Sequence, residues 1–328
     1  MKLQFLIPQY EETNEIVKPL LDSIALQQNV DFNDIGAIIC NDGSEVFLTE
    51  DFLNSYPFKI EYYKEPHGGV SATRNACLDK ATADYVMFCD ADDMFYNMCG
   101  LWIIFREIDN GGFDSLTSIF VEETRMPGTN EKIYINREMD STFVHGKVHR
   151  RKYLIDKNIR WNPNLTIHED SFFNIQCTNL SQNVKYCQAP FYLWKWRDDS
   201  VCRHDPKYIL KTYRNMIDSN DALITEFKKR MVMDKATFYT AFMIFDAYYT
   251  MNKPEWINQE NKEYRDETEY HFSKWYKKHK SDWMAISPQD KIQISQGIRQ
   301  RSVQEGMMLE SMTVDGWLSH IENMRKPK

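Results

Sequence analysis

The sequence contains no long uninterrupted run of apolar residues. None of its apolar stretches approaches 18 residues, the length that a candidate membrane-spanning helix requires. The N-terminus leads directly into a strand-like segment at residues 3–8, without the basic residues and cleavage site of a signal peptide. We therefore expect a cytoplasmic protein that meets a membrane, if at all, as a peripheral protein at the inner face.

Paired cysteines and an excess of positive charge are also absent. The seven cysteines form no Cys-x-x-Cys pair, and their odd number would leave one unpaired. Cys40, Cys77 and Cys89 fall in apolar segments, which indicates reduced cysteines in a protein core. The formal net charge of −8 disfavours nucleic acid and anionic membranes as partners, because like charges repel.

The composition is that of a folded protein: 42% of the 328 residues are hydrophobic and 14% are aromatic. Apolar runs predict strands at residues 3–7, 35–40, 60–63 and 85–89, and helices between them at 16–26, 46–53 and 71–80. This alternation predicts an α/β fold with a mostly parallel sheet flanked by helices. Further extended segments are expected at 115–122, 132–136, 144–150 and 184–196.

The pattern changes near Pro206, which can begin a helix. Beyond it, apolar residues recur at helical spacing, for example at positions 209, 213 and 217 and at positions 238, 242, 245 and 249. The chain is long enough for two domains. We expect an α/β domain at 1–205 and an all-α domain at 206–328 that serves acceptor binding or contacts between copies in a homo-oligomer.

Three aspartates follow the predicted strand at residues 85–89. Asp90, Asp92 and Asp93 would lie at the carboxyl edge of the sheet, where ligands of open α/β sheets bind. Clustered carboxylates suit Mg²⁺ or Mn²⁺, which is normally shared with substrate phosphates. Taken alone, the cluster could equally be a solvated turn.

Polar residues follow the other predicted strands as well. Asp42 can accept a hydrogen bond from a nucleobase, and Gly43 allows a ligand to approach the backbone closely. Ser71 is expected to cap the next helix, and Arg74, one turn inside it, suits a base carbonyl or a diphosphate. Each could be only a turn or capping residue. Their recurrence at successive strand ends predicts a nucleotide site.

A second pair of carboxylates, Glu169 and Asp170, precedes the apolar residues Phe172 and Phe173. Such a pair is most often the acidic first turn of a helix. Transfer to a hydroxyl also needs a general base, and either carboxylate could supply it. Both interpretations stay open.

Taken in order, these segments resemble the family 2 glycosyltransferases over residues 3–205. The segments that carry the resemblance are Ile-Pro-Gln-Tyr (7–10), Asn-Asp-Gly-Ser (41–44), Gly-Gly-Val-Ser-Ala-Thr-Arg-Asn (68–75), Cys-Asp-Ala-Asp-Asp (89–93), His-Gly-Lys-Val-His-Arg-Arg (145–151), His-Glu-Asp-Ser-Phe-Phe (168–173) and Trp-Arg-Asp-Asp-Ser-Val (196–201). The resemblance implies an inverting enzyme of the GT-A fold, with a Rossmann-like nucleotide-binding core, that depends on a nucleotide sugar and on Mn²⁺ or Mg²⁺.

The resemblance also implies roles for individual residues. A donor, expected to be a UDP-sugar, would contact Pro8, Tyr10, Glu12, Asp42, Gly69, Arg74, Asp90, Ala91 and Asp92. Asp92 and His204 would hold the metal, with Asp93 nearby, and Asp170 would be the catalytic base, with Glu169 beside it. The acceptor or the phosphates would meet Lys147, His168, Trp196, Arg197 and Ser200.

The sequence lacks the Gln-x-x-Arg-Trp signature of processive synthases, which favours transfer of a single sugar. The acceptor hydroxyl could belong to a glycan, a polymer, a protein or a modified nucleobase. One alternative function is a nucleotidyltransferase, although the loop after the first strand lacks the glycines and basic residues typical of that class. Another is a glycosyltransferase-like binding protein without activity, against which the presence of both Asp92 and Asp170 argues.

Overall fold

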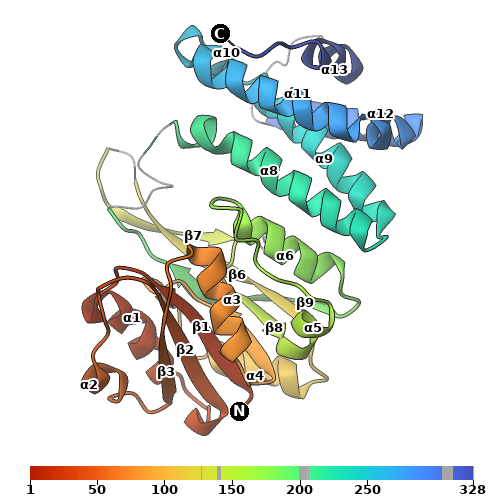
Figure 1. Ribbon diagram of the computed structural model, residues 1–328. Coiled ribbons are helices and arrows are strands. Elements are labelled where there is room, and N and C mark those ends of the chain that lie inside the picture. The colour runs from red at the N-terminus through yellow and green to blue at the C-terminus, as the bar shows by residue number, and fades with distance from the viewer. Residues whose placement is uncertain (127, 139–141, 199–204, 206, 305–312, 328) are drawn as a thin grey trace. The chain divides into compact units, whose positions relative to one another are not determined.

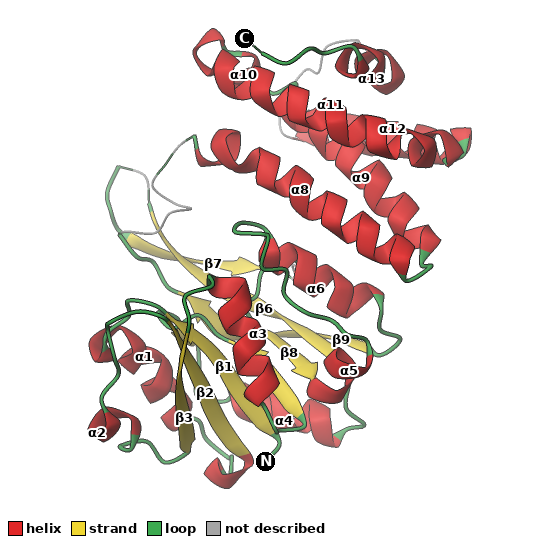
Figure 2. Cartoon of the chain, in the orientation of Figure 1, coloured by secondary structure: helices red, strands yellow, loops and turns green. Residues whose placement is uncertain are grey.

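The structure is a computed structural model that describes residues 1–126, 128–138, 142–198, 205, 207–304 and 313–327 (Figure 1). By its internal contacts the chain divides into two compact units, Met1–Ser200 and Val201–Lys328. The first, which we call the N-terminal unit, is an α/β structure, and the second, the C-terminal unit, is helical (Figure 2). The predicted α/β sheet followed by a helical region is therefore confirmed.

The N-terminal unit is built around a sheet of nine strands in the order β3-β2-β1-β4-β8-β6-β9-β5, with β7 paired to β6. The strands are β1 (Leu3–Gln9), β2 (Ile35–Asp42), β3 (Lys59–Glu65), β4 (Tyr85–Phe88), β5 (Met94–Phe95), β6 (Ser115–Arg125), β7 (Lys132–Arg137), β8 (Lys147–Arg150) and β9 (Val184–Trp194). Strands β3, β2, β1 and β4 are parallel, as predicted. Strand β8 runs antiparallel to β4 and β6, so the second half of the sheet is mixed.

Helices cover both faces of this sheet (Figure 1). They are α1 (Asn14–Ala25), α2 (Glu50–Leu53), α3 (Val70–Lys80), α4 (Gly100–Asp109), α5 (Arg151–Asp156) and α6 (Glu169–Asn179), with a short 3₁₀ helix at Phe32–Asp34. Successive residues of a strand point to opposite faces. On β1, Phe5 accordingly packs with α1 and α4, while Leu6 packs with α3, α5 and α6.

Two local predictions are wrong. The helix expected at 46–53 is confined to α2, because the side chains of Gln9 and Asn41 donate to the Val46 carbonyl and hold the preceding residues in a loop. Ser71 does not cap α3. The N-cap is Gly69, whose φ of +82° is costly for serine, and Ser71 lies buried inside the helix.

The C-terminal unit has the helical spacing expected from the sequence. Its helices are α8 (Tyr208–Lys229), α9 (Met233–Met251), α10 (Pro254–Ile257), α11 (Lys262–Ala285), α12 (Pro288–Gln304) and α13 (Val314–Glu322), with a 3₁₀ helix at Gln259–Asn261. Helix α11 contacts α8, α9 and α13. Of the predicted stripes, Tyr213, Ile217 and Tyr249 are buried, whereas Phe238 and Phe242 are exposed.

Two further features agree with the sequence. Over the described part of the chain, no helix has both the length and the apolar content needed to span a bilayer. Cys40, Cys77 and Cys89 are buried and free, as expected of core cysteines.

Candidate functional site

A cavity of about 470 Å³ lies where β1, β2 and β4 of the N-terminal unit end. This volume is within the usual range for small-molecule sites. Its walls are formed by Pro8, Gln9, Tyr10, Glu12, Asp42, His67, Gly69, Val70, Thr73, Arg74, Asp90, Ala91, Asp92 and Trp194. All nine residues that the sequence assigned to the nucleotide sugar are among them.

One wall is a turn organised by Asp42, the last residue of β2. Its carboxylate accepts hydrogen bonds from the backbone N–H groups of Gly68 (2.7 Å) and Gly69 (3.0 Å). Nδ1 of His67 lies 3.1 Å from the same carboxylate. Gly43, with φ of +73°, lets the chain turn closely against His67. Asp42 therefore holds the loop before α3 against the end of β2.

Beside this turn are two aromatic rings and a buried amide. Tyr10 and His67 lie with ring centroids 5.1 Å apart, and both side chains are largely exposed toward solvent. Gln9 is buried, donates to the Glu12 carbonyl (2.9 Å) and accepts from the Tyr62 hydroxyl (3.0 Å). Gln9 thereby shapes the segment that presents Tyr10 and Glu12 to the cavity.

The aspartate loop after β4 is held by β9. The hydroxyl of Tyr192 donates to Asp93 (2.8 Å) and accepts the backbone N–H of Asp90 (3.2 Å). The backbone N–H of Lys195 also donates to Asp93 (2.9 Å). Burial, together with the charges of Asp92 and Asp90, raises the pKa of Asp93 well above its usual range. Asp93 is thus a buried support of the loop.

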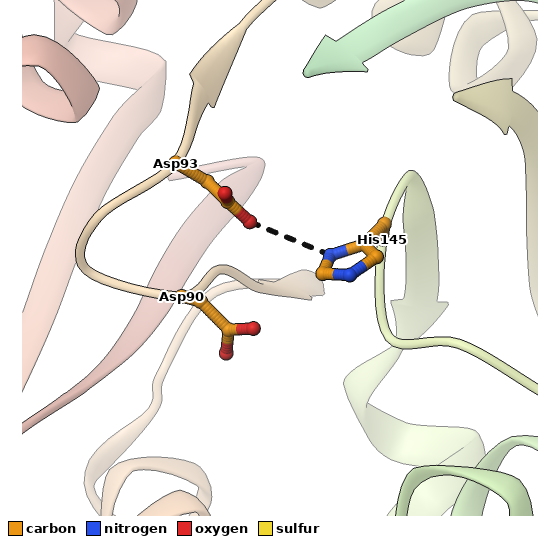
Figure 3. A group of neighbouring side chains, drawn as sticks. All are labelled: Asp90, Asp93 and His145. Carbon is orange, nitrogen blue, oxygen red and sulfur yellow. Dashed lines mark ion pairs between the residues drawn. The ribbon is translucent and has the colours of Figure 1, made fainter. Parts of the chain in front are cut away.

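A histidine from a distant segment faces this loop. Nδ1 of His145 lies 3.5 Å from Asp93, and ligand atoms of Asp90, Asp93 and His145 all lie within 4.8 Å of one another (Figure 3). The His145 ring stacks on Trp194 at 5.0 Å. Such a group has the donor types and spacing to hold a metal ion.

Asp92 forms an ion pair with an arginine from a later segment of the chain. Its carboxylate is 3.0 Å from the guanidinium of Arg197, which also lies 3.8 Å from Glu12. Burial and the charge of Asp90 raise the pKa of Asp92, and Arg197 only partly opposes them. Negative charge in this corner of the cavity is therefore incompletely compensated.

Arg74 joins the aspartate loop to α6. Its guanidinium pairs with Asp90 (2.7 Å) and Glu169 (3.0 Å), and it lies 4.4 Å above the ring of Trp161. Arg74 is only 4% exposed. Burial by itself would raise the pKa of Asp90, but the charges of Arg74 and His145 outweigh it and lower that pKa.

Glu169 and Asp170 form the first turn of α6. The helix begins after His168, which adopts a left-handed conformation (φ of +62°) and makes no side-chain cap. The backbone N–H of Ser171 donates to Asp170 (2.7 Å). Burial and the charge of Glu169 raise the pKa of Asp170 to about 7, against the opposing charge of Arg74.

Among the described residues, the other predicted site residues do not line the cavity. Lys147 is buried in β8, and burial lowers the pKa of His168 to about 4. Trp196 donates its indole N–H to Asp198 (2.8 Å). Ser200 and His204 fall outside the described residues.

Sequence reasoning missed five residues: Gln9, His67, Val70, Trp194 and Thr73, the neighbour of Arg74, line the same cavity. It also assigned no role to His145. Gln9, His67 and Val70 are neighbours of predicted residues and follow the same strand-end signal. His145 and Trp194 carry no such signal, because tertiary contacts bring them to the site.

The cavity lies at the carboxyl ends of the parallel strands β1, β2 and β4, where ligands of open α/β sheets bind. The sequence model described as "Glycosyl transferase family 2" matches residues 5–173, which is more than half of the chain. The chain belongs to this family, and the resemblance expected from its motifs is confirmed.

Two bacterial proteins are similar in sequence. The minor teichoic acid biosynthesis protein GgaB of Bacillus subtilis is 27% identical over 273 residues, which cover 75% of this chain and 28% of GgaB. The poly(ribitol-phosphate) β-N-acetylglucosaminyltransferase TarS of Staphylococcus aureus is 24% identical over 192 residues, 54% of this chain and 32% of TarS. The chain thus spans about a third or less of these relatives.

Crystal structures of TarS residues 1–349 are similar in fold. One of these structures superposes on this chain with a TM-score of 0.61 at 15% identity. The superposition covers 84% of this chain and 81% of the TarS chain. The complex with UDP-GlcNAc has a TM-score of 0.57 at 17% identity, over 84% and 81% of the two chains. The GT-A fold with a helical C-terminal region is therefore confirmed.

The contribution of the Asp42 turn to ligand binding can be tested at Gly43 and Gly111, which both have positive φ. A Cβ at Gly43 would lie 2.6 Å from the backbone nitrogen of His67, whereas a Cβ at Gly111 would meet nothing within 4 Å. Gly111→Ala should lose about 1 kcal/mol of stability through backbone strain, and Gly43→Ala should lose more, because its Cβ also clashes with the backbone of His67. Only Gly43→Ala should also weaken UDP binding, by about tenfold or more. Calorimetry with UDP measures this, and equal affinities in the two variants would show that the turn does not serve the cavity.

Proposed function

We propose that this chain is an inverting glycosyltransferase that moves one sugar from a UDP-sugar to a hydroxyl group. The main support for the proposal is that the Asp42 turn, the Asp90–Asp92 loop and Arg74 line one cavity. Through Arg74, the carboxylates of α6 are joined to the same site. A donor and a base can therefore meet there.

The nucleoside would lie between the end of β1 and the loop before α3. Pro8 and Tyr10 offer an apolar edge and a ring for stacking, and Asp42 offers a carboxylate next to the backbone of Gly68 and Gly69. The Asp42 carboxylate can accept from the N–H of a uracil-type base. Arg197, which pairs with Glu12 and Asp92, is proposed to contact the diphosphate.

The residues present fit a divalent cation. The loop offers hard carboxylate oxygens from Asp90 and Asp92, and the pKa of Asp92 is raised by burial and by its neighbour's charge, a cost that a bound cation would relieve. We propose that Asp92 would hold Mg²⁺ or Mn²⁺ together with Asp90, which also belongs to the group formed with Asp93 and His145. The ion would neutralise charge on the departing diphosphate. His204, the other predicted ligand, stays a prediction.

Asp170 is the proposed general base. Its carboxylate takes the proton of the acceptor hydroxyl while that oxygen attacks the anomeric carbon from the face opposite the diphosphate. The bond from the anomeric carbon to the diphosphate oxygen breaks, and UDP leaves with the bonding electrons. A single displacement inverts the configuration and needs one base and no protein nucleophile. A pKa of about 7 suits a base that works near neutral pH.

The activities for which the relatives are named suggest the substrates. TarS is a poly(ribitol-phosphate) N-acetylglucosaminyltransferase with a UDP-GlcNAc complex, and GgaB serves teichoic acid biosynthesis. We propose UDP-GlcNAc as the first donor to test and the free hydroxyls of a poly(alditol phosphate) as acceptor. The C-terminal helices are proposed to serve acceptor binding or self-association.

This assignment predicts that UDP-GlcNAc with Mn²⁺ raises the melting midpoint, since a ligand that binds only the folded state stabilises it by mass action. GDP- and dTDP-sugars are expected to raise it less at equal concentration. Labelled N-acetylglucosamine should pass to poly(ribitol phosphate) and not to a polymer whose hydroxyls are blocked. A guanosine or thymidine donor that bound tenfold tighter would refute the base-pocket assignment, and binding without transfer to any hydroxyl acceptor would favour the inactive alternative.

Asp92→Asn should weaken Mn²⁺-dependent binding of UDP by about tenfold or more, because the amide removes the charge that attracts the cation. The melting midpoint should change little, since Asp92 faces the cavity and does not pack in the core. Asp156→Asn is the matched control, because Asp156 is an exposed carboxylate on α5 that pairs with Lys152. Calorimetry with and without Mn²⁺ decides, and an unchanged metal dependence in Asp92→Asn would remove Asp92 from the metal site.

Asp170→Asn should lower transfer by roughly 10²–10⁴-fold, since the amide cannot accept the proton, while UDP affinity stays nearly constant. In the wild type, transfer should rise with pH through about 7, because only the ionised carboxylate is a base. The variant should lose this rise. Glu169→Gln should instead weaken donor binding, because Glu169 orients Arg74. A variant at Asp170 that melts earlier yet turns over normally would mean that Asp170 only stabilises the first turn of α6.

A further inference from the structure

One face of α6 carries Asp170, Phe173, Asn174 and Cys177, spaced at i, i+3, i+4 and i+7. Phe173, Asn174 and Cys177 are buried. The face packs toward β8, because the ring of Phe173 meets the ring of His149 edge-on at 5.7 Å. The proposed base therefore belongs to the helix face that lies against β8.

Lys147 occupies the same side of β8 as His149, two residues away. It is 1% exposed, and its ammonium donates to the carbonyl of Phe143. The side-chain amide of Asn174 donates to that same carbonyl at 3.0 Å. The shared acceptor places the ammonium against α6, one helical turn beyond Asp170.

The charge of the Lys147 ammonium affects the pKa values of neighbouring groups. Burial lowers the pKa of His149 to about 3, and Lys147 contributes to that shift. Its charge also opposes the rise that burial causes in the pKa of Cys177 and of Asp170. A buried ammonium is costly to a fold unless nearby groups interact with its charge. The presence of Lys147 against α6 therefore indicates a role for that charge.

Two other charged groups act on Asp170, and Arg74 opposes the rise in its pKa more strongly than Lys147 does. Glu169, on the same helix, repels a second negative charge. Arg74, from α3, attracts it, but its guanidinium is already paired with Asp90 and Glu169. From β8 the neighbouring groups are Lys147 and the neutral His149.

We propose that Lys147 is a positioning residue for the transfer reaction, whose buried ammonium keeps the Asp170 carboxylate in its charged, proton-accepting form. This inference rests on the proposed role of Asp170 as the base. It replaces the sequence-based expectation that Lys147 touches the acceptor or a phosphate, since Lys147 does not line the cavity. No contact between Lys147 and either substrate is required.

The test removes the charge while keeping the hydrogen-bond donor. Lys147→Gln should move the midpoint of the pH–rate profile upward by about half a pH unit, so that transfer falls about twofold at pH 7 and recovers at pH 9. Lys147→Arg keeps a positive charge and should restore the wild-type profile. Lys152→Gln, which neutralises an exposed lysine on α5, is the matched control and should change nothing. Lys147→Met serves as the second neutral variant if the glutamine variant does not fold.

A direct titration separates this inference from the proposed function. The ¹³C signal of the Asp170 carboxyl, assigned by its loss in Asp170→Asn, should titrate about half a pH unit higher in Lys147→Gln than in the wild type. That shift in a protein that transfers no sugar would refute the function and keep the electrostatic role. An unshifted carboxyl, a loss of transfer that is equal at every pH, or a failure of both neutral variants to fold would overturn the inference, because each indicates a structural role alone.

Discussion

The buried guanidinium of Arg74 is the interaction on which the site depends. It bridges Asp90, at the end of β4, and Glu169, at the start of α6, and it lies on the face of Trp161. Removing one partner of such a group leaves a buried charge uncompensated, which is strongly destabilising. The bridge therefore holds the aspartate loop and the proposed base helix in one arrangement, although they come from segments far apart in the chain.

The same bridge contributes to a difference in pKa between the carboxylates of the site. Arg74 contributes to a lowered pKa at Asp90, while Asp170, beside Glu169 and in a buried position, has its pKa raised to about 7. Carboxylates whose environments push their pKa values apart are suited to different tasks. Here Asp90 is suited to binding a cation and Asp170 to accepting a proton. The proposed reaction needs both functions.

The sheet explains how these groups meet. Parallel strands β1, β2 and β4 end at one edge. Strand β8 is antiparallel to β4, with Arg150 beside Tyr85, so the segment before β8 lies at that edge. The loop before β8 carries His145 toward Asp93, and β8 itself carries Lys147 beneath α6. Family membership accounts for the order of the motifs. The family match ends at residue 173 and does not reach the helical C-terminal unit.

The sequence by itself determined the alternation of strands and helices, the helical C-terminal region and the strand-end residues that line the cavity, because periodicity and turn chemistry are local properties. It could not decide whether residues 46–48 form a helix, since side chains of Gln9 and Asn41 claim the Val46 carbonyl. Only the tertiary structure paired Arg74 with Glu169, 95 residues away, and set Lys147 beneath the helix of Asp170. The reason is that charge interactions and burial depend on distances in space, which strand order and helix packing decide and local sequence patterns do not.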